Sequence, residues 1–198
     1  MTEQEIQEKV DRYMENIDRY PDACLNRCSQ LKGESINNII YAAASAIGTD
    51  KKMNSHQCRQ GRVLLAHFAE ELQRHAIAID QCNNFPELLA LVEDIGFNIY
   101  GIRELTCYDT ADRIRVAKGM ELDAVYMHAG TKAGAIAVLG VKNISDKKLP
   151  KSAFPAPFQN LSYEQIENVL CTHFAPKNRN STSSHKKRGS CTPYKANN

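Results

Sequence analysis

The sequence predicts an all-α protein, a compact multi-helix bundle followed by a disordered basic tail. Apolar residues recur at three- and four-residue spacing in several segments, which is the period of a helix buried on one face. Helix-capping residues stand at the ends of these segments, and no convincing run of alternating β-branched residues predicts a sheet. With 198 residues, of which 42% are hydrophobic, the chain can bury a substantial core. We therefore expect one α-helical domain over residues 1–176 and a tail over residues 177–198.

The composition predicts a cytoplasmic protein without a membrane anchor. No apolar run approaches the roughly 18 residues that a membrane span needs. The first residues, MTEQEIQEKVDRY, are acidic and helical, where a signal peptide would be basic and then apolar. The seven cysteines are an odd number without framework spacing. We therefore expect reduced thiols that serve as small apolar residues.

The positive charge of the chain is concentrated in its tail. Residues 177–198 contain no acid and six basic residues, Lys177, Arg179, Lys186, Lys187, Arg188 and Lys195. Removing these six charges from the formal net charge of +2 leaves about −4 on residues 1–176. This composition predicts that the tail is disordered. The tail either binds nucleic acid through its charges, with an affinity that salt weakens, or makes the protein more soluble. The mildly acidic body does not indicate a large nucleic-acid surface.

Helix caps and stops divide the first part of the chain into three helices. Thr2 and Glu5 form a capping-box pattern before a helix that runs to Tyr20 and ends before Pro21. A second helix is expected over residues 22–31, with Gly33 as its stop. Ser35 caps a third helix, rich in alanine, that extends to Gly48.

Two further helices are expected before the middle of the chain. Residues 49–54 are polar and lack a period, so they predict a loop before a long helix that begins near Ser55. Its predicted buried stripe consists of Val63, Leu64, Phe68, Leu72, Ala76 and Ile79. The chain then breaks at residues 83–86, and a short helix follows with Pro86 in its first turn and Gly96 after its end.

Five of the chain's ten glycines lie between residues 99 and 140, where the pattern predicts a helical hairpin. A turn, IYGIRE, leads into a helix over residues 105–118 that stops at Gly119. A short apolar run then enters a small-residue turn at His128 and a helix with Thr131 as N-cap. Residues 141–160 hold three prolines and predict an extended connection. Ser162 and Gln165 form the capping box of a last helix with Ile166, Val169 and Leu170 facing inward.

The order helix, turn, helix over residues 85–130 resembles the helix-hairpin-helix motif of base-excision DNA glycosylases. The family pattern is aliphatic or Pro, Gly, aliphatic, Gly, two variable residues and Thr-Ala, and residues 100–107, YGIRELTC, fill these positions in turn. The resemblance implies that backbone amides of Gly101, Ile102 and Arg103, within a hairpin-like element over residues 85–140, bind a DNA phosphate. Arg103 replaces the second glycine of the family, which carries a steric cost wherever φ must be positive.

The resemblance also suggests catalytic candidates, Asp109, Asp123, Tyr126 and His128. Family members carry a catalytic aspartate two residues before a histidine, and aligning that histidine with His128 puts Tyr126 in the aspartate's place. An alignment without a gap from Arg103 places the family's catalytic aspartate near Asp123 instead. Both alignments remain open. The lysine of bifunctional members is replaced by Leu105, so the resemblance does not imply lyase activity.

Further polar residues near the hairpin admit two interpretations each. Asp109 and Arg113 have the i, i+4 spacing of a local ion pair, which is one interpretation. In the other interpretation they lie near His128, with Asp109 as acid, His128 as base and Arg113 as the group that holds an anion. The small residues from His128 to Gly134 pack helices closely, or their amides and Lys132 bind an anion.

No metal or other cofactor is predicted. Cys24, Cys28, His56 and Cys58 could be drawn as a zinc site, but they lack the CxxC spacing of a zinc knuckle, so buried thiols are the preferred interpretation. His67 and His75 are expected on a polar helix face.

The predicted function is binding of DNA or another phosphate-bearing ligand by a helix-hairpin-helix-like element, in a degenerate relative of a DNA glycosylase. One alternative is a non-enzymatic module that binds a protein partner and whose hairpin is structural. The other alternative is an active DNA-repair glycosylase. The sequence leaves the oligomeric state open.

Overall fold

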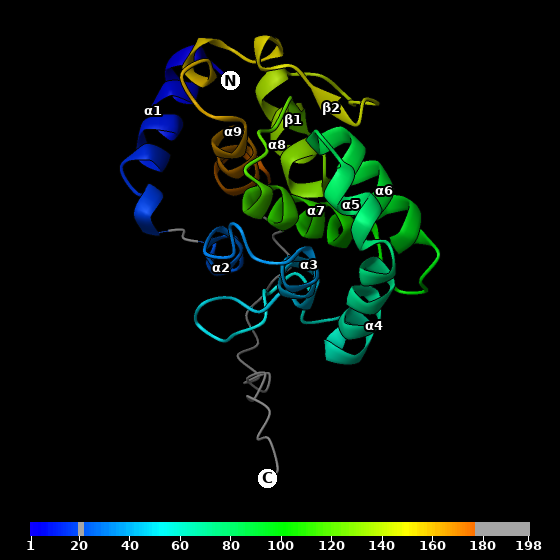
Figure 1. The fold of residues 1–198 in the computed structure, drawn as a ribbon. Helices are drawn as coiled ribbons and strands as arrows, with labels where there is room; N and C mark the ends of the chain where they lie inside the picture. Colours follow the sequence, from blue (N-terminus) through cyan, green and yellow to red (C-terminus); the bar gives the residue numbers. More distant parts are fainter. Residues whose placement is uncertain (20–21, 177–198) are drawn as a thin grey trace, which may run out of the picture. The chain divides into compact units, whose positions relative to one another are not determined.

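A computed structural model describes residues 1–19 and 22–176, and these residues are mostly helical (Figure 1). Their contacts group them into two compact units. We call residues 22–121 the central unit and residues 1–19 with 122–176 the terminal unit. The sequence predicts a single domain over residues 1–176, and each unit is described by itself below. The predicted tail lies outside the described residues.

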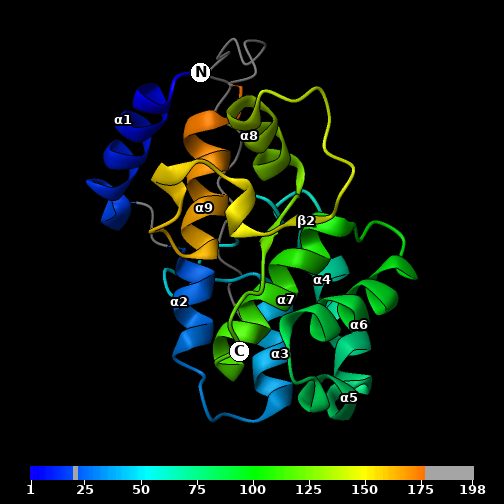
Figure 2. The ribbon, with the colours of Figure 1, turned by 90° about the horizontal axis from the view of Figure 1, so that it is seen from above.

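The central unit is built around one long helix that carries the predicted hairpin residues. This helix, α7 (Glu104–Lys118), packs against α6, α2 and α3, and α3 also packs against α4 (Figure 2). The other helices of the unit are α2 (Ala23–Ser29), α3 (Ile36–Ser45), α4 (Gly61–Arg74), α5 (Ala76–Gln81) and α6 (Phe85–Phe97). The predicted cap at Ser35 is confirmed, and the side chains of Asp22 and Asn84 also accept hydrogen bonds from first-turn amides.

The segment between α3 and α4 is longer than predicted. The α3 helix ends at Ser45, where Ala46 takes the left-handed conformation with φ of 53°, and α4 begins only at Gly61. The prediction of a helix from Ser55 was wrong, because residues 54–60 form turns whose side chains bind α7. The predicted buried stripe was wrong at Val63, which is 87% exposed, and the buried position is that of Leu65.

Gly96 lies inside α6, whereas the sequence predicts that it follows the helix. A Cβ atom at this position would lie 2.5 Å from Sγ of Cys107, so the glycine allows α6 and α7 to pack closely. Cys107 is fully buried in this contact, and burial raises the pKa of its thiol to about 12.

The terminal unit joins the first helix to the last part of the chain. Capping boxes at Thr2 and Ser162 are confirmed for α1 and α9. The two-residue strands β1 and β2 pair antiparallel, with Val125 opposite Leu149, and they were missed because two residues carry no alternating pattern. The elements are α1 (Glu3–Met14), η1 (Ile17–Arg19), β1 (Val125–Tyr126), α8 (Ala129–Leu139), β2 (Lys148–Leu149), η2 (Lys151–Ala153), η3 (Ala156–Phe158), α9 (Tyr163–Val169) and the π-helical turn η4 (Leu170–Phe174).

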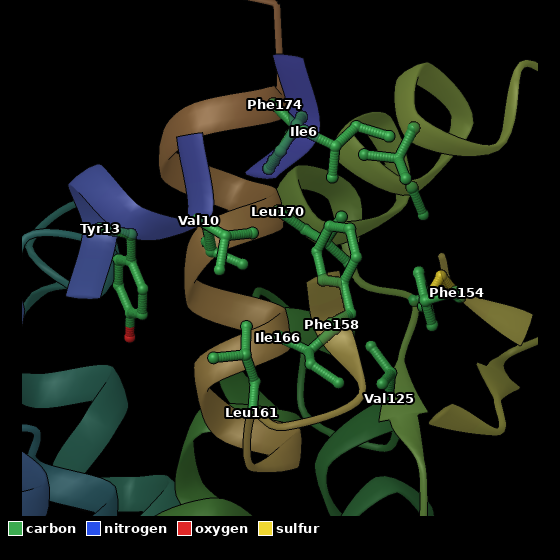
Figure 3. Close-up of a cluster of buried hydrophobic side chains, with 14 of the residues drawn as sticks. Ile6, Val10, Tyr13, Val125, Phe154, Phe158, Leu161, Ile166, Leu170 and Phe174 are labelled. Carbon is green, nitrogen blue, oxygen red and sulfur yellow. The ribbon is translucent and has the colours of Figure 1, made fainter. Parts of the chain in front are cut away.

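The core of the terminal unit brings α1 together with residues more than a hundred positions later in the chain (Figure 3). One face of α1 packs into this core, which the spacing of its apolar residues predicts. The buried residues of this core include Ile6, Val10, Tyr13, Val125, Phe154, Phe158, Leu161, Ile166, Leu170 and Phe174. Within the same unit, a Cβ atom at Gly134 would lie 2.2 Å from the carbonyl oxygen of Leu170, so α8 packs directly on the backbone of η4.

In the part of the chain that the structure describes, none of the helices combines the length and the apolar character that crossing a membrane requires.

Candidate nucleic-acid interface

The α6 and α7 helices form a helical hairpin joined by a tight turn. The carbonyl oxygen of Ile99 accepts a hydrogen bond of 3.1 Å from the amide of Ile102, and Gly101 between them has φ of 99°. Positive φ at the third position is the signature of a type II turn. A Cβ atom at Gly101 would also lie 2.8 Å from a methyl group of Leu64 on α4. Both the backbone conformation and the contact with α4 therefore favour glycine at this position.

Arg103 occupies a backbone position that does not need glycine. Its φ of −135° and ψ of 167° are extended, so the steric cost expected for a second turn glycine does not arise here. Arg103 is also the N-cap of α7, and its side chain makes no capping hydrogen bond. The side chain is exposed.

The first turn of α7 presents amides without acceptors. The amides of Thr106 and Cys107 donate to the carbonyl oxygen of Arg103, whereas those of Glu104 and Leu105 have no acceptor among the described residues. Free amides at a helix N-terminus carry partial positive charge and favour anions. Glu104 places one exposed carboxylate in the same turn.

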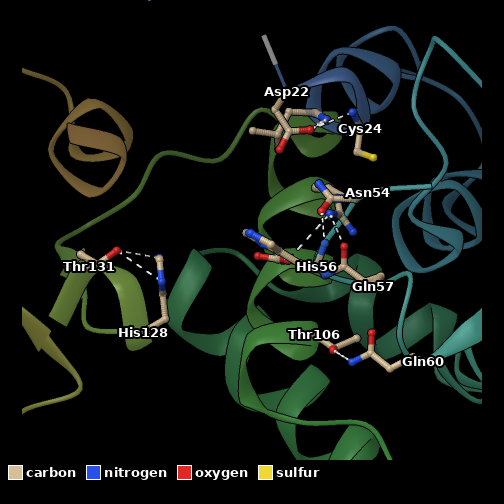
Figure 4. Close-up of polar contacts among 12 residues, drawn as sticks. Asp22, Cys24, Asn54, His56, Gln57, Gln60, Thr106, His128 and Thr131 are labelled. Carbon is tan, nitrogen blue, oxygen red and sulfur yellow. Dashed lines mark hydrogen bonds and ion pairs between the residues drawn. The ribbon is translucent and has the colours of Figure 1, made fainter. Parts of the chain in front are cut away.

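Three exposed arginines belong to the segments that meet at this turn. Gln60 donates a hydrogen bond to the hydroxyl oxygen of Thr106 (Figure 4), and this contact holds the loop that carries Arg59 against α7, just before Arg62 in the first turn of α4. The contact of Leu64 with Gly101 holds the start of α4 at the turn. Arg59, Arg62 and Arg103 form no ion pair with any residue that the structure describes.

Sequence reasoning missed Arg59 and Arg62. A local signal was present, because residues 50–62 contain four Lys or Arg residues against one Asp. The basic residues could not be assigned to the hairpin from the sequence, because the loop contacts α7 through residues more than forty positions apart in the chain.

Arg113, a predicted phosphate ligand, is the largest fully buried side chain of the described residues. Its guanidinium group donates to the carbonyl oxygen of Ala43 at 3.1 Å and to Oε1 of Gln57 at 3.2 Å. Oδ2 of Asp109 lies 3.9 Å away, so the predicted i, i+4 ion pair is present. The arginine therefore binds protein acceptors inside the central unit.

Asp109 lies beside His56, a partner that the sequence did not predict. Nδ1 of His56 is 3.8 Å from Oδ2 of Asp109, and Gln57 donates a hydrogen bond to the same oxygen. The adjacent Asp109 carboxylate raises the pKa of His56 above its ordinary value of 6.5. The His56 side chain is 58% exposed and that of Asp109 is 17% exposed, so the pair is open to solvent on the histidine side.

Two oxygens near this cluster lack hydrogen-bond partners. They are Oε1 of Gln60 and the hydroxyl of Thr110, both buried in the central unit. Because buried polar atoms are seldom left unpaired, this junction between the loop and α7 is suited to an ordered water molecule.

The other catalytic candidates belong to the terminal unit. The hydroxyl group of Tyr126 donates to Oδ1 of Asp123 at 2.7 Å, and Lys148 binds Oδ2. Burial acts to raise the pKa of Asp123, but the hydrogen bonds from Lys148 and Tyr126 and the charge of Lys148 bring it below its ordinary value. Asp123 is therefore held as a carboxylate.

His128 lies beside Glu167 and Thr131. Nε2 of His128 is 3.7 Å from Oε2 of Glu167 and 2.9 Å from the hydroxyl of Thr131, and Oε1 of Glu167 accepts from the amide of Tyr126 at 2.7 Å. His128 is the N-cap of α8, so the prediction of Thr131 as N-cap was wrong. Thr131 is fully buried and its hydroxyl binds the imidazole instead.

The small residues that follow His128 pack helices. A Cβ atom at Gly130 would lie 2.4 Å from Sγ of Cys171, and Gly134 faces the Leu170 backbone. The amide of Lys132 is already bonded to the carbonyl oxygen of His128. These contacts support the packing interpretation of the turn.

Two of the cysteines drawn as a zinc site lie in the interior of the central unit. Cys24 and Cys28 are buried, and burial raises the pKa of Cys28 to about 11. Within residues 1–19 and 22–176, no three His, Cys, Asp or Glu side chains are placed to hold a metal ion.

His67 and His75 line a cavity of about 350 Å³ beside the hairpin, together with residues of α4 and α6. The other lining residues are Glu71, Asp94, Ile95, Asn98 and Ile99. Nδ1 of His67 is 3.9 Å from Oε1 of Glu71. The polar helix face that the sequence predicts for the two histidines therefore forms part of the wall of this cavity.

Comparison of the chain with protein-family models, curated proteins and solved structures gave no match.

Proposed function

We propose that the α6–α7 hairpin binds the phosphate backbone of nucleic acid. One observation carries this proposal, namely that the free amides at the start of α7 adjoin Arg103 and lie beside the segments that carry Arg59 and Arg62, and these three arginines form no ion pair among the described residues. Amides at a helix N-terminus and guanidinium groups are the protein donors best suited to phosphate oxygens. The resemblance of residues 100–107 to the helix-hairpin-helix motif supports the same proposal.

Contacts of this kind involve the phosphate backbone of the nucleic acid, so they do not distinguish one base sequence from another. The amides of Glu104 and Leu105 would hold one phosphate, while the arginines would contact neighbouring phosphates. Each neutralised phosphate releases counterions, so three arginine contacts predict a log–log salt dependence with a slope of about −2.7 on duplex DNA. Glu104 would weaken binding by repelling the same phosphates.

The test compares two triple variants of the full-length chain that lose the same charge. In the first, Arg59, Arg62 and Arg103 are replaced by Ala. In the control, three other exposed basic residues, Arg12, Lys32 and Lys142, are replaced by Ala. DNA binding is measured by fluorescence anisotropy at low salt.

The hairpin variant should lose at least about tenfold in affinity, and the control should lose much less. Glu104→Gln should bind more tightly than the wild-type chain, because it removes the opposing charge. Equal losses in the two triple variants would overturn the proposal, since the affinity would then reflect net charge alone.

A second candidate function is hydrolysis at a damaged base, and the His56–Asp109 pair is the observation that favours it. A carboxylate beside Nδ1 orients an imidazole for general acid–base chemistry, and this imidazole is more than half exposed. Incubation with a panel of damaged-base duplexes tests it, with His56→Gln and Asp109→Asn as matched variants. Unchanged substrates throughout would reject this function. A pull-down that returns one protein and no nucleic acid would favour the structural alternative for the hairpin.

A further inference from the structure

The hairpin exposes large apolar side chains beside its arginines. Tyr100 in the turn is 101% exposed, Phe97 at the end of α6 is 55% exposed, and Val63 at the start of α4 is 87% exposed. Val63 adjoins Arg62 in sequence and Leu64, which touches Gly101. The structure thus places two aromatic rings and an aliphatic side chain around the proposed phosphate site.

The turn presents the Tyr100 ring in a defined place. Tyr100 lies between Ile99, which accepts the turn hydrogen bond, and Gly101, whose positive φ fixes the turn. Ile99 and Ile102 on either side are buried, so they anchor the turn while Tyr100 points to solvent. An exposed aromatic side chain on an anchored turn costs little conformational entropy when it meets a ligand.

Phe97 and Arg103 lie within reach of the same ligand. Each is three residues from Tyr100, so its Cα atom is at most about 10 Å from that of Tyr100. That distance spans a few nucleotides of a single strand. Bases can therefore meet the rings while the adjoining phosphates meet the arginines.

We propose that the hairpin selects unpaired nucleotides, with Tyr100 and Phe97 stacking on bases while Arg59, Arg62 and Arg103 hold phosphates. This inference rests on the proposed function and names the substrate class of the same site. In a duplex the faces of the bases are covered by neighbouring bases, so exposed aromatic rings contribute little there. In a single strand every base offers a face, and stacking adds to the phosphate contacts.

The charges around the rings favour a nucleic acid over an apolar protein surface as the occupant. Three arginines without ion pairs among the described residues and the free helix amides belong to the same meeting segments as the rings, and a neutral apolar partner covering them would have to desolvate them without compensation. A polyanion with aromatic bases satisfies both kinds of group.

The experiment uses the full-length chain and three fluorescein-labelled probes of about 20 residues, which exceeds the span of roughly 4–16 nucleotides of a typical single-strand site. The probes are oligothymidylate, oligouridylate and a DNA duplex, all at one ionic strength. We expect one or both single strands to bind about tenfold more tightly than the duplex. The ratio of the two single-strand affinities shows whether DNA or RNA is the preferred source.

Substitutions at Tyr100 separate stacking from other contacts. Tyr100→Ala and Tyr100→Leu should weaken single-strand binding about tenfold, and Tyr100→Phe should retain it. Tyr41→Ala is the matched control, because Tyr41 is a 51% exposed tyrosine on α3 of the same unit. Since Tyr100 is fully exposed, these substitutions leave the fold intact, which circular dichroism checks.

The possible failures can be told apart. Absence of affinity for all three probes would overturn the proposed function together with this inference. Duplex binding that equals or exceeds single-strand binding, with no effect of Tyr100→Ala, would overturn the selection of unpaired nucleotides and leave phosphate binding in place.

Discussion

Each unit of the protein has a pair of a histidine and a carboxylate that includes a catalytic candidate, and these two pairs differ in their surroundings. In the central unit His56 is 3.8 Å from Asp109, and in the terminal unit His128 is 3.7 Å from Glu167. The His56 side chain is 58% exposed, whereas that of His128 is 17% exposed. The nearly equal distances therefore occur in an open and in an enclosed setting.

The difference shows how the surroundings of a pair decide its role. Glu167 is held by the amide of Tyr126, and His128 is held by the hydroxyl of Thr131, so the enclosed pair ties β1, α8 and α9 together. The open pair closes the loop before α4 onto α7 and leaves the imidazole in contact with solvent. The open pair is suited to titration and ligand contact, and the enclosed pair is suited to stability.

The largest expected effect is at the buried arginine that supports the open pair. Replacing Arg113 with Met leaves Asp109 without its cation and leaves the Ala43 carbonyl and Gln57 without donors. We expect the free energy of unfolding to fall by about 3–5 kcal/mol, as when one partner of a buried ion pair is removed. Urea unfolding followed by circular dichroism measures this.

The matched control is Arg103→Met, which removes an exposed arginine of the same unit and should change stability by no more than about 0.5 kcal/mol. A loss below about 1 kcal/mol for Arg113→Met would show that the cluster does not depend on the buried charge.

A smaller effect is expected where α8 meets η4 beside the enclosed pair. The Cβ atom of Gly134→Ala would approach the backbone oxygen of Leu170, which cannot rotate away, so stability should fall by about 1–3 kcal/mol. Gly130→Ala is the comparison, because the Cys171 side chain that it would meet can change rotamer. Urea denaturation of both variants should rank Gly134→Ala as the more damaging, and the reverse order would contradict the packing described for α8.

Alanine substitution of the two histidines tests the comparison directly. His128→Ala removes a neighbour of the buried Glu167 and should cost about 1–3 kcal/mol. His56→Ala removes an exposed partner and should cost less than about 1 kcal/mol. Thermal and urea unfolding of the two variants measure both costs. If His56→Ala proved as costly as His128→Ala, the division into an open and an enclosed pair would fail.

The smallest expected effect is the pH dependence of the open pair. Because Asp109 raises the pKa of His56 above 6.5, the contribution of His56 to stability is fully present below that value. The contribution is lost as the pH rises through the raised pKa of the folded state. The difference in urea midpoint between the wild-type chain and His56→Gln should therefore shrink with increasing pH. A difference that grows with pH would contradict the pairing with Asp109.

Local sequence signals predicted three helix starts correctly. Thr2, Ser35 and Ser162 cap helices as expected, because a capping side chain binds an amide two or three residues away. The Asp109–Arg113 spacing was also informative, since both groups lie on one helix.

Features that depend on distant contacts could not be predicted in this way. The loop before α4 follows no periodic pattern, because its turns are fixed by bonds from Gln57 and Gln60 to α7. His56 became the partner of Asp109 by the same route, across more than fifty positions in the chain. The sequence predicts Gly96 as a helix stop, whereas in the structure it leaves room for the sulfur atom of Cys107.

Because Cys107 is buried against Gly96, its reactivity can serve as a probe of the contact between α6 and α7. A thiol that is fully buried and whose pKa is raised to about 12 reacts with alkylating reagents only after the helices around it separate. The alkylation rate of Cys107 at neutral pH therefore measures how often α6 and α7 part, without any introduced label. A nucleic acid bound across the turn would slow that reaction, so this sulfur atom can record occupancy of the hairpin.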